Sequence, residues 1–310
     1  MLSRRLLPNK MILDKELRSG VLPRRSWRYL WRRAQLLLRY RFAPSLPLTF
    51  ELKEGPWYRL FCDDNVGEIL FLENTNCLSV RSYDPAERLF VSRFLQSGEV
   101  FFDVGANSGL YSLIAALSVG SSGAVHAFEP APSEFRRLEE NIKFNRFEQV
   151  NIVPVAIGSH NDQTEFWPLS GRRASLSSLR PLAEEMSPPI SVEMRTLDNY
   201  IQSSGVKRLD LCKIDVEGAE PDVLAGGVMV FGRGGLQPVV ICELADKRAA
   251  AFGRRAVETV RRFESLGYRW YCITYDCLLE LAPRHEKFDC ENCVASPIGS
   301  NILKERGLIA

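Results

Sequence analysis

The stretch VFFDVGANSG, residues 100–109, decides the fold of this chain. Its first five residues form a short, almost wholly apolar run, which is typical of a strand buried between two layers of helices. A turn with Gly105 and Gly109 follows, and an apolar helix is expected over 111–117. A buried strand that enters a helix through a glycine turn is the opening unit of a doubly wound α/β sheet.

The same alternation of apolar runs and helical patterns continues toward the C-terminus. Further strands are predicted at 124–128, 150–155, 209–214, 239–242 and 268–273, and helices at 85–95, 133–145, 221–225 and 250–266. Strands that alternate with helices predict an α/β fold with a mostly parallel, Rossmann-like sheet covered on both faces.

Composition places the chain among ordinary globular proteins. Of its 310 residues 45% are hydrophobic and 25% are charged, which excludes a disordered, collagen-like or coiled-coil protein. The net charge of +2 argues against a nucleic-acid partner for the chain as a whole. No apolar stretch is long enough to span a membrane, and the N-terminus lacks the apolar core of a secretory signal. A cytoplasmic location is therefore expected.

The N-terminal segment differs from the rest in charge. Residues 1–50 carry a net charge of +10, so the remaining 260 residues carry −8. From residue 26 apolar residues recur at helical spacing with arginines between them, namely Trp27, Leu30, Trp31, Ala34 and Leu38. Either the tryptophan face packs on the main domain and the arginines stay solvated, or residues 24–41 make peripheral contact with an anionic membrane surface.

Four regions are expected along the chain. Residues 1–47 form a basic arm with its amphipathic helix, 48–84 a small β appendage that covers one edge of the main domain, 85–300 the main domain, and 301–310 a tail. Within the appendage, Ile69 to Leu72 is predicted to be extended. The polar insertion at 159–195 either shapes a substrate pocket or is a plain surface excursion.

The glycine turn predicts the kind of ligand. A dinucleotide site needs glycine at the first, third and sixth places, but Asn107 occupies the third, which argues against an NAD-dependent oxidoreductase. The remaining acid-x-Gly-x-x-x-Gly pattern suits a nucleoside with an amino-acid tail, because Asp103 can accept from an ammonium and helix-start amides can meet a carboxylate. S-adenosylmethionine has these parts. The expected turn contacts are Asp103, Gly105, Ala106, Asn107, Ser108 and Gly109.

A second acid supports this assignment. Glu129 ends the second predicted strand, where a carboxylate can accept from both ribose hydroxyls, and Pro130 stiffens the turn after it. Taken singly, Asp103 could be a turn-stabilising acid and Glu129 a surface acid. Because they end consecutive strands of one βαβ unit, we expect them to hold the amino and sugar parts of one cofactor.

Three segments together resemble the FkbM-type methyltransferases: the glycine turn at 100–109, Phe128-Glu129-Pro130, and Lys-Ile-Asp-Val-Glu-Gly-Ala-Glu at 213–220. The likeness extends from about Pro85 to Ala295 and includes VAIG at 155–158, TLD at 196–198 and Glu243. It implies a class I methyltransferase fold with a seven-stranded sheet and a reversed last hairpin. It also implies S-adenosylmethionine as donor, with Ala156 in the cofactor site, and usually a hydroxyl on a sugar or natural product as acceptor.

Methyl transfer to a hydroxyl needs aligned reactants and a group that removes the proton. Asp215, Glu217 and Glu243 follow or end strands, where open α/β sheets bind ligands. We expect Asp215 to contact cofactor or acceptor, and Glu217 and Glu243 to bind the acceptor or remove its proton. Alternatively, Glu217 and Glu220 only favour the positive end of the helix that begins near Pro221.

The expected function is an S-adenosylmethionine-dependent O-methyltransferase with a small-molecule or glycan acceptor and no metal. Cys290 and Cys293 have metal-like spacing, but the spacing of Cys272 and Cys277 is too loose for a second pair, so inert thiols are favoured over zinc. Two alternatives stay open: a methyltransferase-like binding protein without activity at a membrane surface, and an NAD-dependent oxidoreductase.

Overall fold

The computed structural model describes residues 24–43, 46–61, 64–73, 83–169, 177–181, 188–274, 277–283 and 286–309. The elements in chain order are α2 (Arg24–Phe42), β1 (Leu48–Glu51), β2 (Trp57–Leu60), α3 (Asn65–Glu73), α4 (Pro85–Phe94), β3 (Val100–Val104), α5 (Leu110–Val119), β4 (Ala124–Phe128), α6 (Pro132–Asn145), β5 (Val150–Val153), β6 (Ala156–Ile157), β7 (Asp162–Phe166), β8 (Ile190–Arg195), α7 (Leu197–Ser204), β9 (Leu211–Ile214), α8 (Glu220–Ala225), α9 (Val228–Phe231), β10 (Val239–Leu244), α10 (Asp246–Ala249), η2 (Ala250–Phe252), α11 (Ala256–Ser265), β11 (Tyr268–Ile273), β12 (Leu279–Leu281), β13 (Glu291–Pro297) and α12 (Ile302–Glu305).

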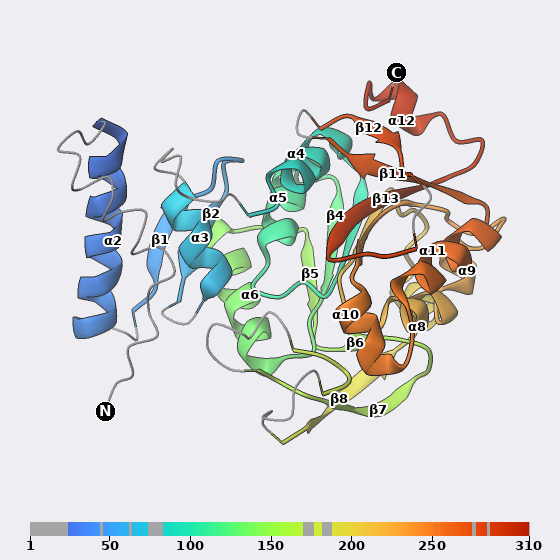
Figure 1. The fold of residues 1–310 in the computed structure, drawn as a ribbon, viewed down its shortest axis with the longest axis horizontal. Coiled ribbons are helices and arrows are strands. Elements are labelled where there is room, and N and C mark those ends of the chain that lie inside the picture. The colour runs from blue at the N-terminus through green and yellow to red at the C-terminus, as the bar shows by residue number, and fades with distance from the viewer. Residues whose placement is uncertain are drawn as a thin grey trace.

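The central sheet has the strand order β12-β11-β13-β10-β9-β3-β4-β5 (Figure 1). Strands β10, β9, β3, β4 and β5 are parallel neighbours, and β13 runs antiparallel to both β10 and β11. The predicted doubly wound sheet with a reversed strand in its last hairpin is confirmed. The prediction of seven strands is one short, because a turn after β11, in which Thr274 N donates to Leu278 O, returns the chain as the edge strand β12.

Side chains that alternate along the strands build two hydrophobic cores, one on each face of the sheet. Phe101 of β3 belongs to the core that α4 and α5 cover, together with Val125 and Ile241. Its neighbour Phe102 belongs to the opposite core, which includes Phe263 of α11. All of these side chains are almost fully buried. A parallel strand buried on both faces explains why the run at 100–104 is apolar throughout.

The N-terminal appendage differs from its prediction at one segment. Ile69 to Leu72 lies in helix α3, which begins because the Asp64 carboxylate accepts from Gly67 N at 2.7 Å. The β1–β2 hairpin does not pair with the edge of the sheet. It packs on α6, whose Asn145 amide bonds both backbone groups of Trp57 at 2.8 and 2.7 Å.

Helix α2 presents an apolar face to solvent. It packs beside α3, with Leu36 buried and the Arg32 guanidinium 4.5 Å from the ring centre of Phe71. Trp31 is 65% exposed and Leu38 57% exposed. For these two residues the prediction that the tryptophan face packs on the main domain is wrong, because an arginine and a leucine make the inward contacts instead. None of the helices in the described ranges is both long and apolar enough to cross a membrane.

Two further segments complete the fold. The insertion at 159–195 contributes β7 and β8 to a three-stranded sheet in the order β6-β8-β7, and its residues 170–176 and 182–187 lie outside the described ranges. The C-terminal tail packs on the domain, with Leu303 and Leu308 buried. Arg306 of the tail pairs with the buried carboxylate of Glu99 at 2.5 Å.

Candidate active site

The glycine turn brings three strand ends into close contact. Gly105 has a φ of +85°, and a Cβ there would lie 1.9 Å from the carbonyl oxygen of Asp215. Both Gly105 N and Ala106 N donate to Phe128 O, at 3.0 and 2.9 Å. Gly109 has a φ of +95°, and its Cβ would lie 2.6 Å from Leu138 Cδ1. Gly105 therefore lies where the chain after β3 approaches the ends of β4 and β9, and Gly109 lies where it approaches α6.

Asp103 carries an unused acceptor beside this turn. Its side chain is 1% exposed, and Oδ2 accepts from the Ser112 hydroxyl at 2.6 Å. Among the described residues Oδ1 has no hydrogen-bond partner. Burial raises the pKa of Asp103, while the Lys213 ammonium and the Ser112 hydroxyl act in the opposite direction. A buried oxygen without a partner is costly, so its presence points to a donor supplied by a ligand.

Glu129 holds the turn from the β4 side. Its two oxygens accept from Asn107 N at 2.8 Å and from Ala131 N at 2.7 Å. Burial raises the pKa of Glu129 to about 8, although both amide donors act to lower it. Pro130 lies between these contacts, and Ala156 is buried in the same small cluster as Ala131. The structure brings Glu129 to the glycine turn, as a shared cofactor site requires.

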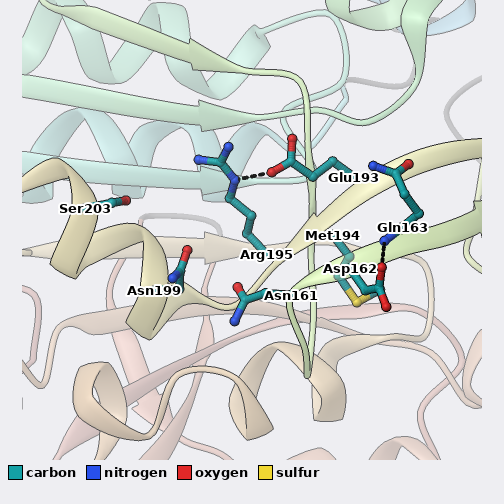
Figure 2. Close-up of a pocket in the computed structure, with 8 residues that line it drawn as sticks. All are labelled: Asn161, Asp162, Gln163, Glu193, Met194, Arg195, Asn199 and Ser203. Atoms are coloured by element: carbon teal, nitrogen blue, oxygen red, sulfur yellow. Dashed lines mark hydrogen bonds and ion pairs between the residues drawn. The ribbon is translucent and has the colours of Figure 1, made fainter.

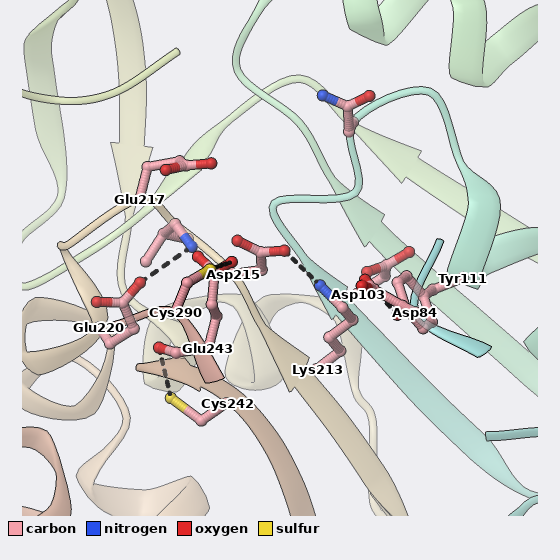
Figure 3. A network of polar contacts seen from close by, with 12 residues as sticks. Asp84, Asp103, Tyr111, Lys213, Asp215, Glu217, Glu220, Cys242, Glu243 and Cys290 are labelled. Atoms are coloured by element: carbon pink, nitrogen blue, oxygen red, sulfur yellow. Dashed lines mark hydrogen bonds and ion pairs between the residues drawn. The ribbon is translucent and has the colours of Figure 1, made fainter. Parts of the chain in front are cut away.

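The three predicted acids beyond β9 and in β10 come together (Figure 3). One carboxylate oxygen from each of Asp215, Glu217 and Glu243 lies within 4.8 Å of the other two. Arg248 pairs with Glu217 and, at 2.5 Å, with Glu243. Lys213 Nζ pairs with Asp215 Oδ2 at 2.7 Å. We call Asp215, Glu217 and Glu243 the acid cluster.

The acids of this cluster differ in their electrostatics. Burial acts to raise the pKa of Asp215, but the Lys213 ammonium and the Arg248 guanidinium hold that pKa below its usual value. Burial and the charge of Asp215 raise the pKa of Glu243 to about 8. Burial and both neighbouring acids raise the pKa of Glu217 well above its usual value. One acid is therefore anionic near neutral pH, while two are poised to hold or exchange a proton.

The backbone after β9 gives Glu217 and Glu220 different contacts. Glu220 Oε1 accepts from Gly218 N at 3.1 Å and from Val216 N at 3.3 Å, so Glu220 stabilises the loop at the start of α8. Glu217 has a φ of +57°, in the left-handed region, and its side chain pairs with Arg248 instead. An unfavourable backbone conformation at a charged residue is typical of functional sites.

Several side chains at this site were not predicted from the sequence. Arg248 pairs with two of the acids from the short helix α10, whose sequence has no recognisable motif. Asp84 has a φ of 42° and accepts from the Tyr111 hydroxyl at 3.0 Å. The Lys213 Nζ lies 4.6 Å from the centre of the Tyr111 ring. The Asp-Pro pair at 84–85 predicts the start of a helix, but this local pattern does not predict the contact between Asp84 and Tyr111.

The described part of the insertion contacts the acid cluster through Ser178. Ser178 is buried, and its hydroxyl donates to Glu217 O at 3.2 Å. The insertion also forms an open pocket of about 480 Å³ with α7 (Figure 2). Its lining shares no residue with the glycine turn or the acid cluster and consists of Asn161, Asp162, Gln163, Glu193, Met194, Arg195, Asn199 and Ser203.

The acid cluster is also the one group of at least three acidic, histidine or cysteine side chains in the described ranges whose geometry could hold a metal ion. Arg248 already supplies positive charge to two of its members. The four late cysteines make no such group. Cys290 donates to Glu243 Oε1 at 3.2 Å, and Cys293 lies in β13 opposite Cys272.

Comparison with known proteins gives matches to methyltransferases. The chain is 32% identical to the 2-O-methyltransferase NoeI of Sinorhizobium fredii over 153 residues, which are 45% of this chain and 62% of NoeI. It is 32% identical to the 31-O-demethyl-FK506 methyltransferase FkbM of Streptomyces tacrolimicus over 158 residues, which are 43% of this chain and 60% of that protein. The chain thus spans less than two thirds of the length of these curated relatives.

Among solved structures, the methyltransferase FkbM from Methylobacillus flagellatus aligns with a TM-score of 0.41 at 15% identity, over 75% of this chain and 55% of that one. The sequence profile of the Methyltransferase FkbM domain matches residues 103–270, more than half of the 310 residues. That range includes the glycine turn, Glu129 and the acid cluster. The chain belongs to the FkbM methyltransferase domain family.

Proposed function

We propose that this protein is an S-adenosylmethionine-dependent O-methyltransferase that acts on a hydroxyl of a small molecule or glycan. The observation that carries the proposal is the buried Asp103 Oδ1, which has no partner among the described residues and lies beside a turn in which Gly105 has no room for a side chain. A cationic amino group of the cofactor would supply the missing donor.

The residues of the turn fit this cofactor. Asp103 would accept from its ammonium group, and Glu129, already fixed by two backbone amides, would accept from its ribose hydroxyls through the remaining lone pairs. Pro130 and Ala156 would border the nucleoside. When bound, S-adenosylmethionine supplies an activated methyl group. The third-place Asn107 has no place in a pyrophosphate site, which disfavours the nicotinamide alternative.

The acid cluster would serve the acceptor. Glu243, with a pKa of about 8, or Glu217 would take the proton of the acceptor hydroxyl as the new bond forms. Asp215, held anionic by Lys213, would orient the acceptor or the cofactor from between the two halves of the site. Arg248 would keep the two glutamates together while either of them is ionised.

The relatives support the reaction class and leave the acceptor open. NoeI and FkbM are O-methyltransferases by name, and a third relative, the hexuronic acid methyltransferase AglP of Haloferax volcanii, is 29% identical over 139 residues. Their named acceptors differ from one another. The names print demethyl-FK506 and a hexuronic acid as acceptors, and the proposed class of small-molecule or glycan hydroxyls covers both.

Isothermal calorimetry tests the cofactor assignment. We expect binding of S-adenosylmethionine and S-adenosylhomocysteine and no binding of NAD, and we expect about 10- to 100-fold weaker binding in Glu129→Ala. Binding of NAD alone would revive the oxidoreductase. Transfer of labelled methyl groups to fractionated glycans and small molecules then separates an enzyme from an inactive binding protein.

We also propose that α2 docks on an anionic membrane surface. The helix contains seven arginines and no acidic residue. Trp31, Leu38 and Phe42, seven and four residues apart, share one face and are 65%, 57% and 76% exposed. An apolar stripe on a strongly basic helix fits the interface of a bilayer with acidic headgroups. The six cysteines in the described ranges are all free, which supports a cytoplasmic location for this contact.

Vesicle co-sedimentation tests the docking. We expect the full chain to pellet with phosphatidylglycerol vesicles but not with pure phosphatidylcholine vesicles, and a variant with serine at Trp31, Leu38 and Phe42 to stay in solution. Leu281→Ser/Ile298→Ser is the matched control, since both side chains are equally exposed but lie far from α2 in sequence. Equal pelleting of all variants would reject membrane docking through this face. So would a wild-type protein that does not bind vesicles but forms a dimer that the triple variant loses, because the face would then bind a second copy of the chain.

A further inference from the structure

The N-terminal hairpin reaches the glycine turn through a buried tyrosine. Tyr58 of β2 is fully buried, and its hydroxyl lies 2.5 Å from Ser108 Oγ in the turn. The same hydroxyl donates to Asp64 Oδ2 at 2.8 Å. Because the phenol has one proton and gives it to Asp64, the Ser108 hydroxyl must donate to Tyr58. A directed chain of hydrogen bonds therefore runs from the turn to the appendage.

A second contact between the same two parts uses α6. Asn141 is fully buried, and its Nδ2 donates to Ser108 O at 2.8 Å. Its Oδ1 accepts from Arg59 N, the residue after Tyr58, at 2.7 Å. Ser108 is thus linked to β2 twice. Its hydroxyl bonds Tyr58 directly, and its carbonyl is linked through Asn141 to the next residue, Arg59.

The packing around Tyr58 leaves little room for movement. Gly67 of α3 lies so close that a Cβ there would be 2.8 Å from Tyr58 Cε1 and 2.4 Å from Asp64 Oδ2. Asp64 Oδ1 is in turn fixed by Gly67 N at 2.7 Å. The acceptor end of the hydrogen-bond chain is therefore locked by a helix outside the matched domain of 103–270.

We infer that Tyr58 is a positioning residue for the cofactor, which holds Ser108 of the glycine turn while Glu129 holds the neighbouring Asn107. Glu129 accepts from Asn107 N, and Tyr58 accepts from the Ser108 hydroxyl. The appendage is then a working part of the cofactor site, although it lies outside the family domain. The inference rests on the proposed cofactor site and deepens it.

The test is a double-mutant cycle on cofactor affinity in the full chain. Tyr58→Phe and Ser108→Ala each remove one end of the same hydrogen bond, and each should raise the Kd for S-adenosylhomocysteine about tenfold. The double variant should be no weaker than either single one, because the bond can be lost only once. In turnover, the KM for S-adenosylmethionine should rise while kcat stays within about twofold.

Tyr268→Phe is the matched control. Its hydroxyl is buried and has no hydrogen-bond partner among the described residues, so its loss should leave the Kd unchanged. A lower Tm with wild-type Kd in Tyr58→Phe would show a purely structural role and overturn the inference, as would effects of the two single variants that multiply. Should Tyr58→Phe fail to fold, Asp64→Asn, which removes the carboxylate that orients the Tyr58 hydroxyl, decides by the same Kd criterion. Failure of the wild type to bind the cofactor would instead reject the proposed function.

Discussion

The two halves of the proposed active site are held together by different forces. In the cofactor half, from Asp103 to Ala131, backbone amides make most of the contacts: Gly105 N and Ala106 N donate to Phe128 O, and Glu129 accepts from two further amides. These bonds join neighbouring strands over a short stretch of sequence. The geometry of this half therefore depends on backbone conformation and on the absence of side chains at the glycines.

In the acceptor half, charged side chains make the contacts. The acid cluster is held by Lys213 and Arg248, which come from β9 and from α10, and the three acids come from two different strand ends. Like charges at this spacing repel unless cations or protons compensate them. This half therefore depends on protonation and ion pairing. The difference teaches that added side-chain volume should damage the cofactor half most, whereas loss of charge should damage the acceptor half most.

The largest effect is expected where volume enters the cofactor half. Gly105→Ala should abolish measurable cofactor binding, a loss of more than ~100-fold, because the new Cβ would lie 1.9 Å from the backbone oxygen of Asp215 at a φ of +85°. Calorimetry with S-adenosylhomocysteine measures the loss. Gly205→Ala is the matched control, since it has a similar φ of +72° but nothing within 4 Å of its Cβ. Equal losses in both variants would mean that backbone strain alone, and not the closed turn, accounts for the effect.

The next effect concerns charge in the acceptor half. One of the two glutamates, Glu243 or Glu217, is the general base. Of the variants Glu243→Gln and Glu217→Gln, the one that loses this base should have a kcat about 100-fold lower, because proton removal contributes about that factor. The Kd for S-adenosylhomocysteine should change less than about threefold in both. Steady-state kinetics with saturating cofactor and calorimetry separate the two quantities. A large rise in Kd with unchanged kcat would place the acid cluster in cofactor binding and remove the distinction between the halves.

The cofactor half could be predicted from the sequence much better than the acceptor half, for a physical reason. Strands β3, β4 and β11 are buried on one or both faces, so their apolar runs predict their bounds at 100–104, 124–128 and 268–273 without error. Asp103 and Glu129 follow from those strand ends, because parallel strands end at the same edge. The family assignment is confirmed, whereas the role of each acid stays a prediction.

Features that depend on tertiary contacts could not be predicted from the sequence. Helix α2 has apolar residues on more than one face, and a cation over Phe71 rather than the tryptophan face decides its orientation. A short apolar run such as Ile69 to Leu72 fits either a strand or a helix. The hydrogen bond from Gly67 N to the Asp64 carboxylate caps a helix here. Arg248 reaches the acid cluster from the separate helix α10, and no local pattern encodes a contact between distant segments.

A smaller effect tests the role of Arg248 within the acceptor half. Arg248→Met removes the cation that lowers the pKa of both glutamates, so their pKa values should rise and the ascending limb of the pH–kcat profile should move to higher pH. At neutral pH, kcat should fall about tenfold. Arg254→Met is the matched control, because it breaks the ion pair with Asp222 outside the acid cluster. A uniform fall of kcat at all pH values, without movement of the limb, would contradict an electrostatic role.

The smallest effect asks whether the cofactor half is also sensitive to charge. Burial raises the pKa of Glu129 from 4.5 to about 8, so the folded chain holds a proton that the unfolded chain releases between these values. The free energy of unfolding should therefore fall as pH rises through this window. In Glu129→Gln this contribution is absent, and the fall in Tm between pH 5.5 and 8.5 should be smaller by about 2–5 °C than in the wild type. Thermal unfolding without cofactor measures it, with the exposed Glu148→Gln as control. An unchanged dependence of Tm on pH would mean that the two amide donors keep Glu129 ionised despite its burial. Glu129 would then be a permanently charged hydrogen-bond acceptor in the cofactor half.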